Sequence, residues 1–406
     1  MAHDHGPAAP ASRQLRLILA GILIPAALVI AALMVLLHGG GGAPRLPSGL
    51  GPRVDLVHAD IIDSAQHACP TGGDDTPADD QSECLTLHVR LTSGPHRGTT
   101  TSFDVQSTRS TPIPHRGGIV VSYDPTAEAG DQYAFADIQR GHALTLLFLV
   151  FALAVVAVAR WTGLRALIGL GASLAVLLGF VLPALLAGRG ALPVALVGSS
   201  AVLFLVLFIA HGVNVRTSIA VVGTLTSLLL CGALAQLFVV GTALTGLGSD
   251  EADLLSATVR IDLRGLLLAG VVIGALGAVV DMTVTQSTAV WQLHAANPAA
   301  SFTSLYHSAM HIGRDHVAAA TTTLVLAYVG TSLPLLVVYQ LARTDLTTVV
   351  TGETVAAEIV RTLVGSLGLV AAVPVTTALA ALAVRADAIG SRVHRHARRE
   401  GSSWAV

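Results

Sequence analysis

The sequence predicts an α-helical polytopic membrane protein with about eight transmembrane helices and a small β-rich extracytoplasmic domain. Hydrophobic residues make up 53% of the chain and charged residues only 12%, about half the charged share of ordinary soluble domains. Uncharged apolar runs recur along the chain, and about 20 residues of this kind suffice to cross the hydrocarbon core of a bilayer. A polar stretch between the first two runs shows the alternation of β-strands.

The first apolar run, residues 17 to 37, predicts an uncleaved transmembrane anchor behind a short cytoplasmic N-terminus of residues 1 to 16. A secretory signal peptide is the alternative. The run is longer than a signal-peptide apolar region, and no clear small-residue cleavage site precedes the glycines that follow it, so we favour the anchor.

The polar stretch, residues 43 to 138, predicts the β-rich domain, because segments such as 85 to 91 and 118 to 123 alternate apolar and polar residues. This stretch contains Cys69 and Cys84. A disulfide between them is expected if the domain lies outside the cytoplasm, where oxidising conditions allow such bonds. Two separate thiols are the alternative.

Residues 142 to 384 predict a bundle of seven transmembrane helices. The apolar runs are 143 to 159, 164 to 187, 191 to 210, 217 to 245, 263 to 280, 317 to 341 and 363 to 384. Small residues dominate these runs, and they allow helices to pack closely in lipid.

Arginine placement predicts the orientation, since basic residues collect in cytoplasmic segments. With the N-terminus inside, inner segments hold Arg13, Arg16, Arg160, Arg165, Arg216, Arg314, Arg385, Arg392, Arg395, Arg398 and Arg399, whereas outer segments hold Arg189, Arg260, Arg264 and Arg343. Both termini are therefore expected in the cytoplasm. The basic tail, residues 385 to 406, is expected to contact anionic lipid rather than nucleic acid.

The most informative segment is residues 282 to 316, which is polar but not loop-like. On a helix, Asp281, Thr285, Thr288 and Gln292 share one face. Ionisable groups at membrane depth are costly, so we expect Asp281 and Asp315 to line an enclosed or watered cavity or to pair with Arg314. The segment then forms a re-entrant element; a hairpin on the membrane surface is an equal alternative.

Three other groups are candidates for the same pathway or for a metal site. His307, His311 and Asp315 recur every four residues and offer three ligands at helical spacing. The Thr322 hydroxyl could coordinate a cation, although bonding to a helix carbonyl is more common. Glu358 and Arg361 stand at positions i and i+3, the spacing of an intrahelical ion pair.

Enzyme chemistry finds little support. The chain contains no nucleotide-binding glycine loop, no Ser/His/Asp or Cys/His arrangement and no HExxH motif. An aspartyl pair of Asp281 and Asp315 could act as a hydrolase, but we expect no enzyme activity and no cofactor.

Several motifs of this chain resemble the YibE/F-like family of bacterial membrane proteins. They are Gly274-Ala-Leu-Gly277-Ala-Val-Val-Asp281, Ile312-Gly313-Arg314-Asp315, Thr323-Leu324, Ala327-Tyr328-Val329-Gly330, Glu358-Ile359-Val360-Arg361, Gly365-Ser366-Leu367-Gly368 and Pro374-Val375-Thr376. The resemblance extends from about residue 133 to 384. It implies a bacterial plasma membrane protein with Asp281, Arg314, Asp315, Glu358 and Arg361 as a shared site, and it does not include His307 or His311.

Two functions are therefore expected as alternatives. The first is a transporter or permease for a small solute or ion, whose pathway uses Asp281, Thr285, Arg314, Asp315, Thr322, Glu358 and Arg361. The second is a membrane scaffold whose extracytoplasmic domain binds a partner in the cell envelope. The expected partners are the lipid bilayer and, for the transporter, a small solute or ion. A homo-oligomer is left open for either function, and no binding of nucleic acid is expected.

Overall fold

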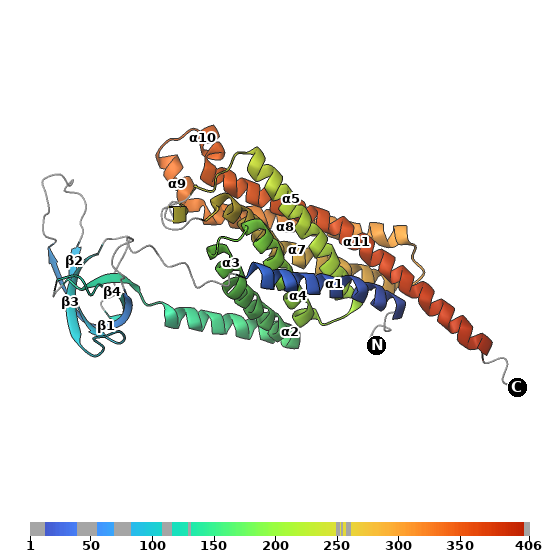
Figure 1. Ribbon diagram of the computed structural model, residues 1–406, viewed down its shortest axis with the longest axis horizontal. Helices are drawn as coiled ribbons and strands as arrows, with labels where there is room; N and C mark the ends of the chain where they lie inside the picture. Colours follow the sequence, from blue (N-terminus) through green and yellow to red (C-terminus); the bar gives the residue numbers. More distant parts are fainter. Residues whose placement is uncertain are drawn as a thin grey trace. The chain divides into compact units, whose positions relative to one another are not determined.

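The computed structural model (Figure 1) describes residues 13–38, 55–68, 83–107, 116–128, 131–248, 252, 255, 256 and 261–401. The chain divides into two compact units, one of residues 1–45 and 156–406 and one of residues 46–155. The first unit is helical, and the second contains the five strands and the beginning of a helix. A mostly helical chain with a small β-rich region confirms the coarse fold class.

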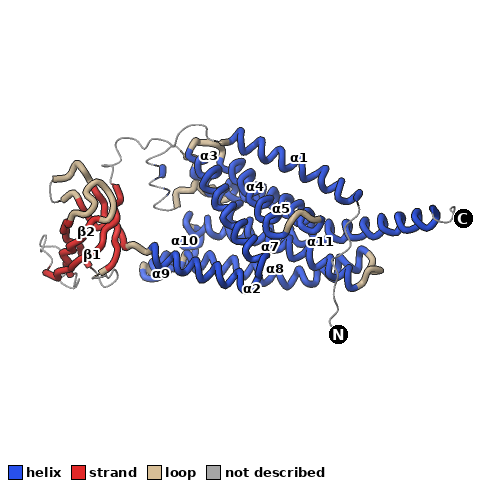
Figure 2. Tube along the Cα trace, turned by 90° about the horizontal axis from the view of Figure 1, so that it is seen from below, coloured by secondary structure: helices blue, strands red, loops and turns tan. Residues whose placement is uncertain are grey.

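The β-rich unit contains one antiparallel sheet in the order β3-β2-β1-β4-β5 (Figure 2). The strands are β1 (Asp55–Ala68), β2 (Glu83–Leu91), β3 (Thr100–Ser107), β4 (Gly117–Tyr123) and β5 (Tyr133–Ile138). Strands β3 and β5, at the two ends of the order, also contact each other, so the sheet curls. Alternate residues such as Val57, Leu87 and Ile119 form one buried apolar face, as the period-two pattern predicts.

Leu87→Ala is expected to destabilise this unit by about 2–5 kcal/mol, because it removes a completely buried side chain from the centre of the sheet. Leu87 is opposite Ser64 on β1 and Phe103 on β3. The check is limited proteolysis of the full-length chain during a temperature ramp, in which the variant should be cut within 55 to 138 at lower temperature. His88→Ala, on the exposed side of the same strand, should leave the cutting temperature nearly unchanged.

In the helical unit, α5, α7 and α11 pack against one another, and α4 and α8 pack against this group. The helices of the chain are α1 (Arg13–Leu37), α2 (Gly141–Val176), η1 (Leu177–Val181), α3 (Leu182–Leu186), α4 (Ala191–His211), α5 (Val215–Gly241), α7 (Leu263–Ala296), α8 (Phe302–Thr331), α9 (Leu333–Leu341), α10 (Leu346–Thr351) and α11 (Glu353–Gly401). Among the described residues, six helices are long and apolar enough to cross a membrane, or seven if α8 and α9 form one bent span.

Two breaks distinguish the observed helices from the predicted spans. Arg160 has φ 53° and ψ −129° inside α2, which separates the predicted spans 143 to 159 and 164 to 187. The predicted span 317 to 341 is not straight, since α8 and α9 meet at an angle of 58°. Pro334 follows Ser332 there, and proline disfavours a continuous helix through the preceding turn.

Residues 282–316 do not form a separate element. The helix α7 continues through Asp281 to Ala296, a short turn follows, and α8 begins at Phe302. The Ser301 hydroxyl caps α8 by accepting a hydrogen bond from the Ser304 N–H at 3.2 Å, a common helix start. The predicted polar segment is therefore the hairpin between two long helices.

One carboxylate joins the first residue of α11 to the loop that follows α5. Glu353 Oε1 accepts hydrogen bonds from the N–H groups of Thr245, Gly246 and Leu247 at 2.7, 2.6 and 3.2 Å. The Thr245 hydroxyl also donates to this carboxylate at 2.7 Å. Several bonds to one ionised group are among the stronger contacts in a protein, so this end of the helical unit is firmly joined.

Candidate functional site

An ion pair between Glu358 and Arg361 marks the candidate site. Both residues belong to α11, and Arg361 Nη1 lies 3.2 Å from Glu358 Oε1. Each side chain is only 28% exposed, so the pair lies largely among helices. The helical spacing predicted this contact, since residues three apart face the same side of a helix.

Residues of two neighbouring helices surround the pair. Tyr328 of α8 interacts electrostatically with both Glu358 and Arg361. Gly270 and Gly274 of α7 leave the space that these side chains occupy. A Cβ at Gly270 would lie 3.5 Å from Arg361 Nη2, and one at Gly274 would lie 2.9 Å from the Tyr328 hydroxyl. The small residues on α7 thus allow a cation and a phenol to approach the helix backbone.

Several polar atoms at this site retain hydrogen-bonding capacity. Glu358 Oε2 and Arg361 Nε are buried and have no hydrogen-bond partner among the described residues. Buried polar groups are nearly always paired in proteins, and exceptions often mark functional positions. We name Tyr328, Glu358 and Arg361 the charged site.

Beyond the charged site, further polar side chains are buried on α5, α7 and α11, three helices that pack against one another. The members of this polar line are Thr217, Ser218, Thr224 and Ser227 of α5, Thr283, Gln286 and Ser287 of α7, and Thr362, Ser366, Thr376 and Thr377 of α11. Thr224 and Thr283 share a hydrogen bond of 2.6 Å between their hydroxyls. Gln286 Nε2 donates to the Thr377 hydroxyl and to the Ala309 carbonyl, both at 2.9 Å.

The polar line ends at a cavity of about 230 Å³ beside the turn between α4 and α5. Most of its lining is polar, namely His211, Asn214, Arg216, Thr217, Ser287 and Thr288, with Ala220 and Val284. The Ser287 hydroxyl donates to the Arg216 carbonyl at 3.0 Å and fixes α7 against α5 here. The charged site, the polar line and this cavity therefore contain groups that can bind polar solutes or water at several positions along the bundle.

The other predicted pathway residues lie elsewhere. Asp281 of α7 is exposed, and Thr285 is half-buried one turn further along the helix. Arg314, Asp315 and Thr322 are exposed on α8. Within the described residues none of Asp281, Arg314 and Asp315 forms an ion pair, so the predicted pairing with Arg314 is absent. Neighbouring residues on a helix point in different directions, which disfavours an Arg314–Asp315 contact.

The predicted metal site is not formed. No group of three His, Cys, Asp or Glu side chains in the described part of the chain could hold a metal ion, and this part includes His307, His311 and Asp315. His307 and Asp315 are eight residues apart on one helix, or about 12 Å along its axis. His307 Nδ1 also lies 2.8 Å from the Thr303 carbonyl. A single straight helix therefore cannot close all three side chains around one ion.

Two smaller predictions concern Thr322 and the cysteines. The Thr322 hydroxyl donates to the Ala318 carbonyl at 2.9 Å, the helix bond that was the alternative to a cation. Cys84 is disulfide-bonded, whereas Cys69 lies outside the described residues, and the pairing of these two stays a prediction. Cys231 is a buried free thiol.

Sequence reasoning found Glu358 and Arg361 but did not assign Tyr328 to their site. The signal that could have found Tyr328 is the glycine spacing on α7, because Gly270 and Gly274 are one turn apart and open one face of that helix. Gln286 and the threonines of α11 were also missed, since single hydroxyl and amide residues in apolar helices are common.

The fold and the site together define a class of protein, in which a bundle of apolar helices encloses a charged pair and a line of buried polar groups. Residues 147–386 match the family model described as YibE/F-like protein, and the chain belongs to this family. The matched region includes every residue of the charged site and of the polar line. Neither a curated protein nor a solved structure matches the chain.

Proposed function

We propose that this protein is a membrane transporter or permease for a small solute or ion. The observation that carries this proposal is the half-buried Glu358–Arg361 pair, with Glu358 Oε2 and Arg361 Nε buried and unpaired among the described residues. Enclosing charges among apolar helices is costly, and such groups commonly belong to substrate or ion pathways. A bound solute that completes these hydrogen bonds would offset part of that cost.

We further propose eight crossings with both termini in the cytoplasm. The run from α2 to α3 spans 46 residues, about 69 Å if it were straight, which exceeds one crossing of about 30 Å. A break at Arg160 divides it into two crossings, and α8 with α9 supplies one more. The orientation is supported by contacts between Leu15, Leu19, Val290, Leu305 and Ala380 to Val384, since they bring the start of α1, the α7–α8 turn and the inner part of α11 to one end.

Arginines are unequally divided between the two ends of this bundle. The end that contains the start of α1 has Arg13, Arg16, Arg216 and Arg385, whereas Arg189, Arg264 and Arg343 adjoin the helices of the opposite end. The basic tail begins beside Arg385. This asymmetry favours the first end as cytoplasmic, and it then assigns the β-rich unit to the extracytoplasmic side of a bacterial plasma membrane.

The proposal is tested by capacitive current measurements on vesicles that contain the purified full-length protein. Gradients of H⁺, Na⁺, K⁺, Mg²⁺, Cl⁻, phosphate and neutral amino acids are applied one at a time. We expect one of these gradients to give a current that empty vesicles lack and that Arg361→Ala reduces at least tenfold. Currents equal to those of empty vesicles for every gradient would contradict transport of these solutes.

Exposed titratable side chains on α7 and α8 favour the second function, a membrane scaffold. Asp281, His311 and Asp315 are exposed on helices that are otherwise apolar enough to enter a membrane, and a second chain could cover them. Removal of residues 43 to 138 distinguishes the functions. The scaffold is favoured if the deletion removes a co-purifying envelope protein and neither the full-length protein nor the deletion variant gives a current above that of empty vesicles. A current that survives the deletion favours transport.

A further inference from the structure

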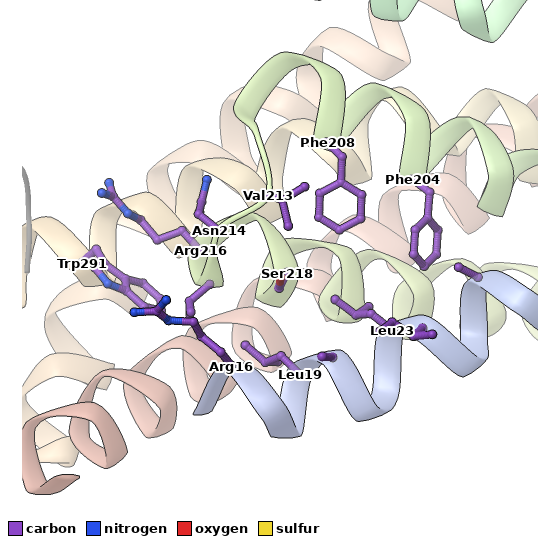
Figure 3. Close-up of a pocket in the computed structure, with 14 residues that line it drawn as sticks. Arg16, Leu19, Leu23, Phe204, Phe208, Val213, Asn214, Arg216, Ser218 and Trp291 are labelled. Carbon is purple, nitrogen blue, oxygen red and sulfur yellow. The ribbon is translucent and has the colours of Figure 1, made fainter. Parts of the chain in front are cut away.

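A cavity of about 700 Å³ lies between α1, α4 and the beginning of α5, apart from the charged site. Figure 3 shows the residues that line it. The buried residues of α1 are Leu15, Leu19 and Leu23, and its second half packs against the core through the partly buried Ile30, Leu33, Met34 and Leu37. The other sides of α1 are largely exposed. The cavity is lined by residues of both α1 and α4. The volume falls within the range of about 300–1,000 Å³ that is usual for ligand pockets.

One end of the cavity is cationic. Arg16 of α1 and Arg216 of α5 both line it, and Trp291 of α7 lies at the same end (Figure 3). Asn214 adds a polar amide. Two guanidinium groups from different elements form charge-assisted hydrogen bonds best with phosphate or carboxylate oxygens. Tryptophan is also enriched where a bilayer meets water.

The remaining wall is apolar. Leu19 and Leu23 of α1 face Phe204 and Phe208 of α4 across the space, which extends away from the arginines along both helices (Figure 3). A small hydrophilic anion would satisfy the charges but leave this wall exposed. The ligand that matches both parts has an anionic head and a long apolar chain.

From this arrangement we infer that the cavity binds an anionic phospholipid. Its phosphate lies between Arg16 and Arg216, and one acyl chain fills the space between α1 and α4. Basic pockets between transmembrane helices on the cytoplasmic side bind acidic lipid headgroups in this manner. Such a lipid would also fill the space beside the first half of α1.

The test measures lipid retention by native mass spectrometry of the full-length protein, mixed with equal amounts of phosphatidylglycerol and phosphatidylcholine. We expect phosphatidylglycerol to be retained at least tenfold more than phosphatidylcholine. Arg16→Gln combined with Arg216→Gln should remove this preference. Arg13→Gln is the matched control, because Arg13 is one turn from Arg16 but does not line the cavity, and it should leave retention unchanged.

A second variant separates the apolar wall from the charge. Ala20 lines the cavity, so Ala20→Trp fills the space while both arginines remain, and we expect it to reduce phosphatidylglycerol retention at least tenfold. Equal retention of both lipids by the wild-type protein, or unchanged preference in the double arginine variant, would overturn the inference. Displacement of the lipid by millimolar inorganic phosphate, with full retention in Ala20→Trp, would show a headgroup-only anion site and overturn it as well.

Discussion

Glu358→Gln is expected to reduce transport at least tenfold while the protein still inserts into membranes. The substitution keeps the shape of the side chain but removes its charge, which leaves the Arg361 guanidinium without its counter-ion in a largely enclosed position. Removal of one partner from a buried ion pair is more damaging than the net value of the pair, because the other charge stays behind uncompensated. The measurement is the initial current in vesicles under the gradient that the wild-type protein transports.

Two controls separate a pathway role from a structural role. Glu358→Arg combined with Arg361→Glu restores an ion pair in the reverse order, and it should recover the melting temperature in detergent but not the current. Asp281→Asn removes a carboxylate of α7 that is exposed rather than enclosed, and it should retain the current. The proposed site is wrong if Asp281→Asn loses transport and Glu358→Gln keeps it, since the pathway would then pass Asp281 rather than the Glu358–Arg361 pair.

Gly368→Ala is expected to destabilise the helical unit clearly, although it adds only one methyl group. A Cβ at Gly368 of α11 would overlap the sulfur of Cys231 on α5. The thiol is completely buried, and its sulfur lies 3.9 Å from the Val364 carbonyl oxygen, so it has little room to move. Overpacking of this kind costs about 1–3 kcal/mol, which should appear as a lower melting temperature in detergent.

Cys231→Ala should restore most of the stability lost in Gly368→Ala. It removes the sulfur but keeps its own Cβ, which would lie 3.6 Å from the new methyl group, an ordinary contact. Cys231→Ala alone should cost only about 1 kcal/mol for the small cavity that it leaves. If the double variant is as unstable as Gly368→Ala, the close approach of α5 and α11 at this position is incorrect.

Much of the helical framework could be predicted from the sequence, because apolar length and charge placement report directly on burial in lipid. Helices α1, α4 and α5 begin and end within four residues of the predicted spans. The predicted span ended at residue 280, whereas α7 continues without a break through its polar second half. This half of α7 is buried by partners such as Thr224 and Thr377, which only the fold brings near. A hydropathy pattern records the residues of one segment but not the neighbours that satisfy them.

The candidate site was only partly accessible to sequence reasoning. Glu358 and Arg361 are on one helix, so their contact follows from spacing alone. Tyr328 comes from another helix, and its approach depends on the absence of a side chain at Gly274. His307, His311 and Asp315 share a face, yet a metal site also needs the correct separation along the axis and ligands from a second direction, which periodicity does not report.

The carboxylate of Glu353 has a mechanical consequence for α11. It ties the first residue of this helix to three successive N–H groups of the loop that follows α5. The distance from Glu353 to Arg385 along the helix is about 48 Å. Any tilting of α11 against α5 therefore pivots near Glu353, and the displacement grows along the rod until it is greatest beside Arg385, at the end of the bundle where α1 begins.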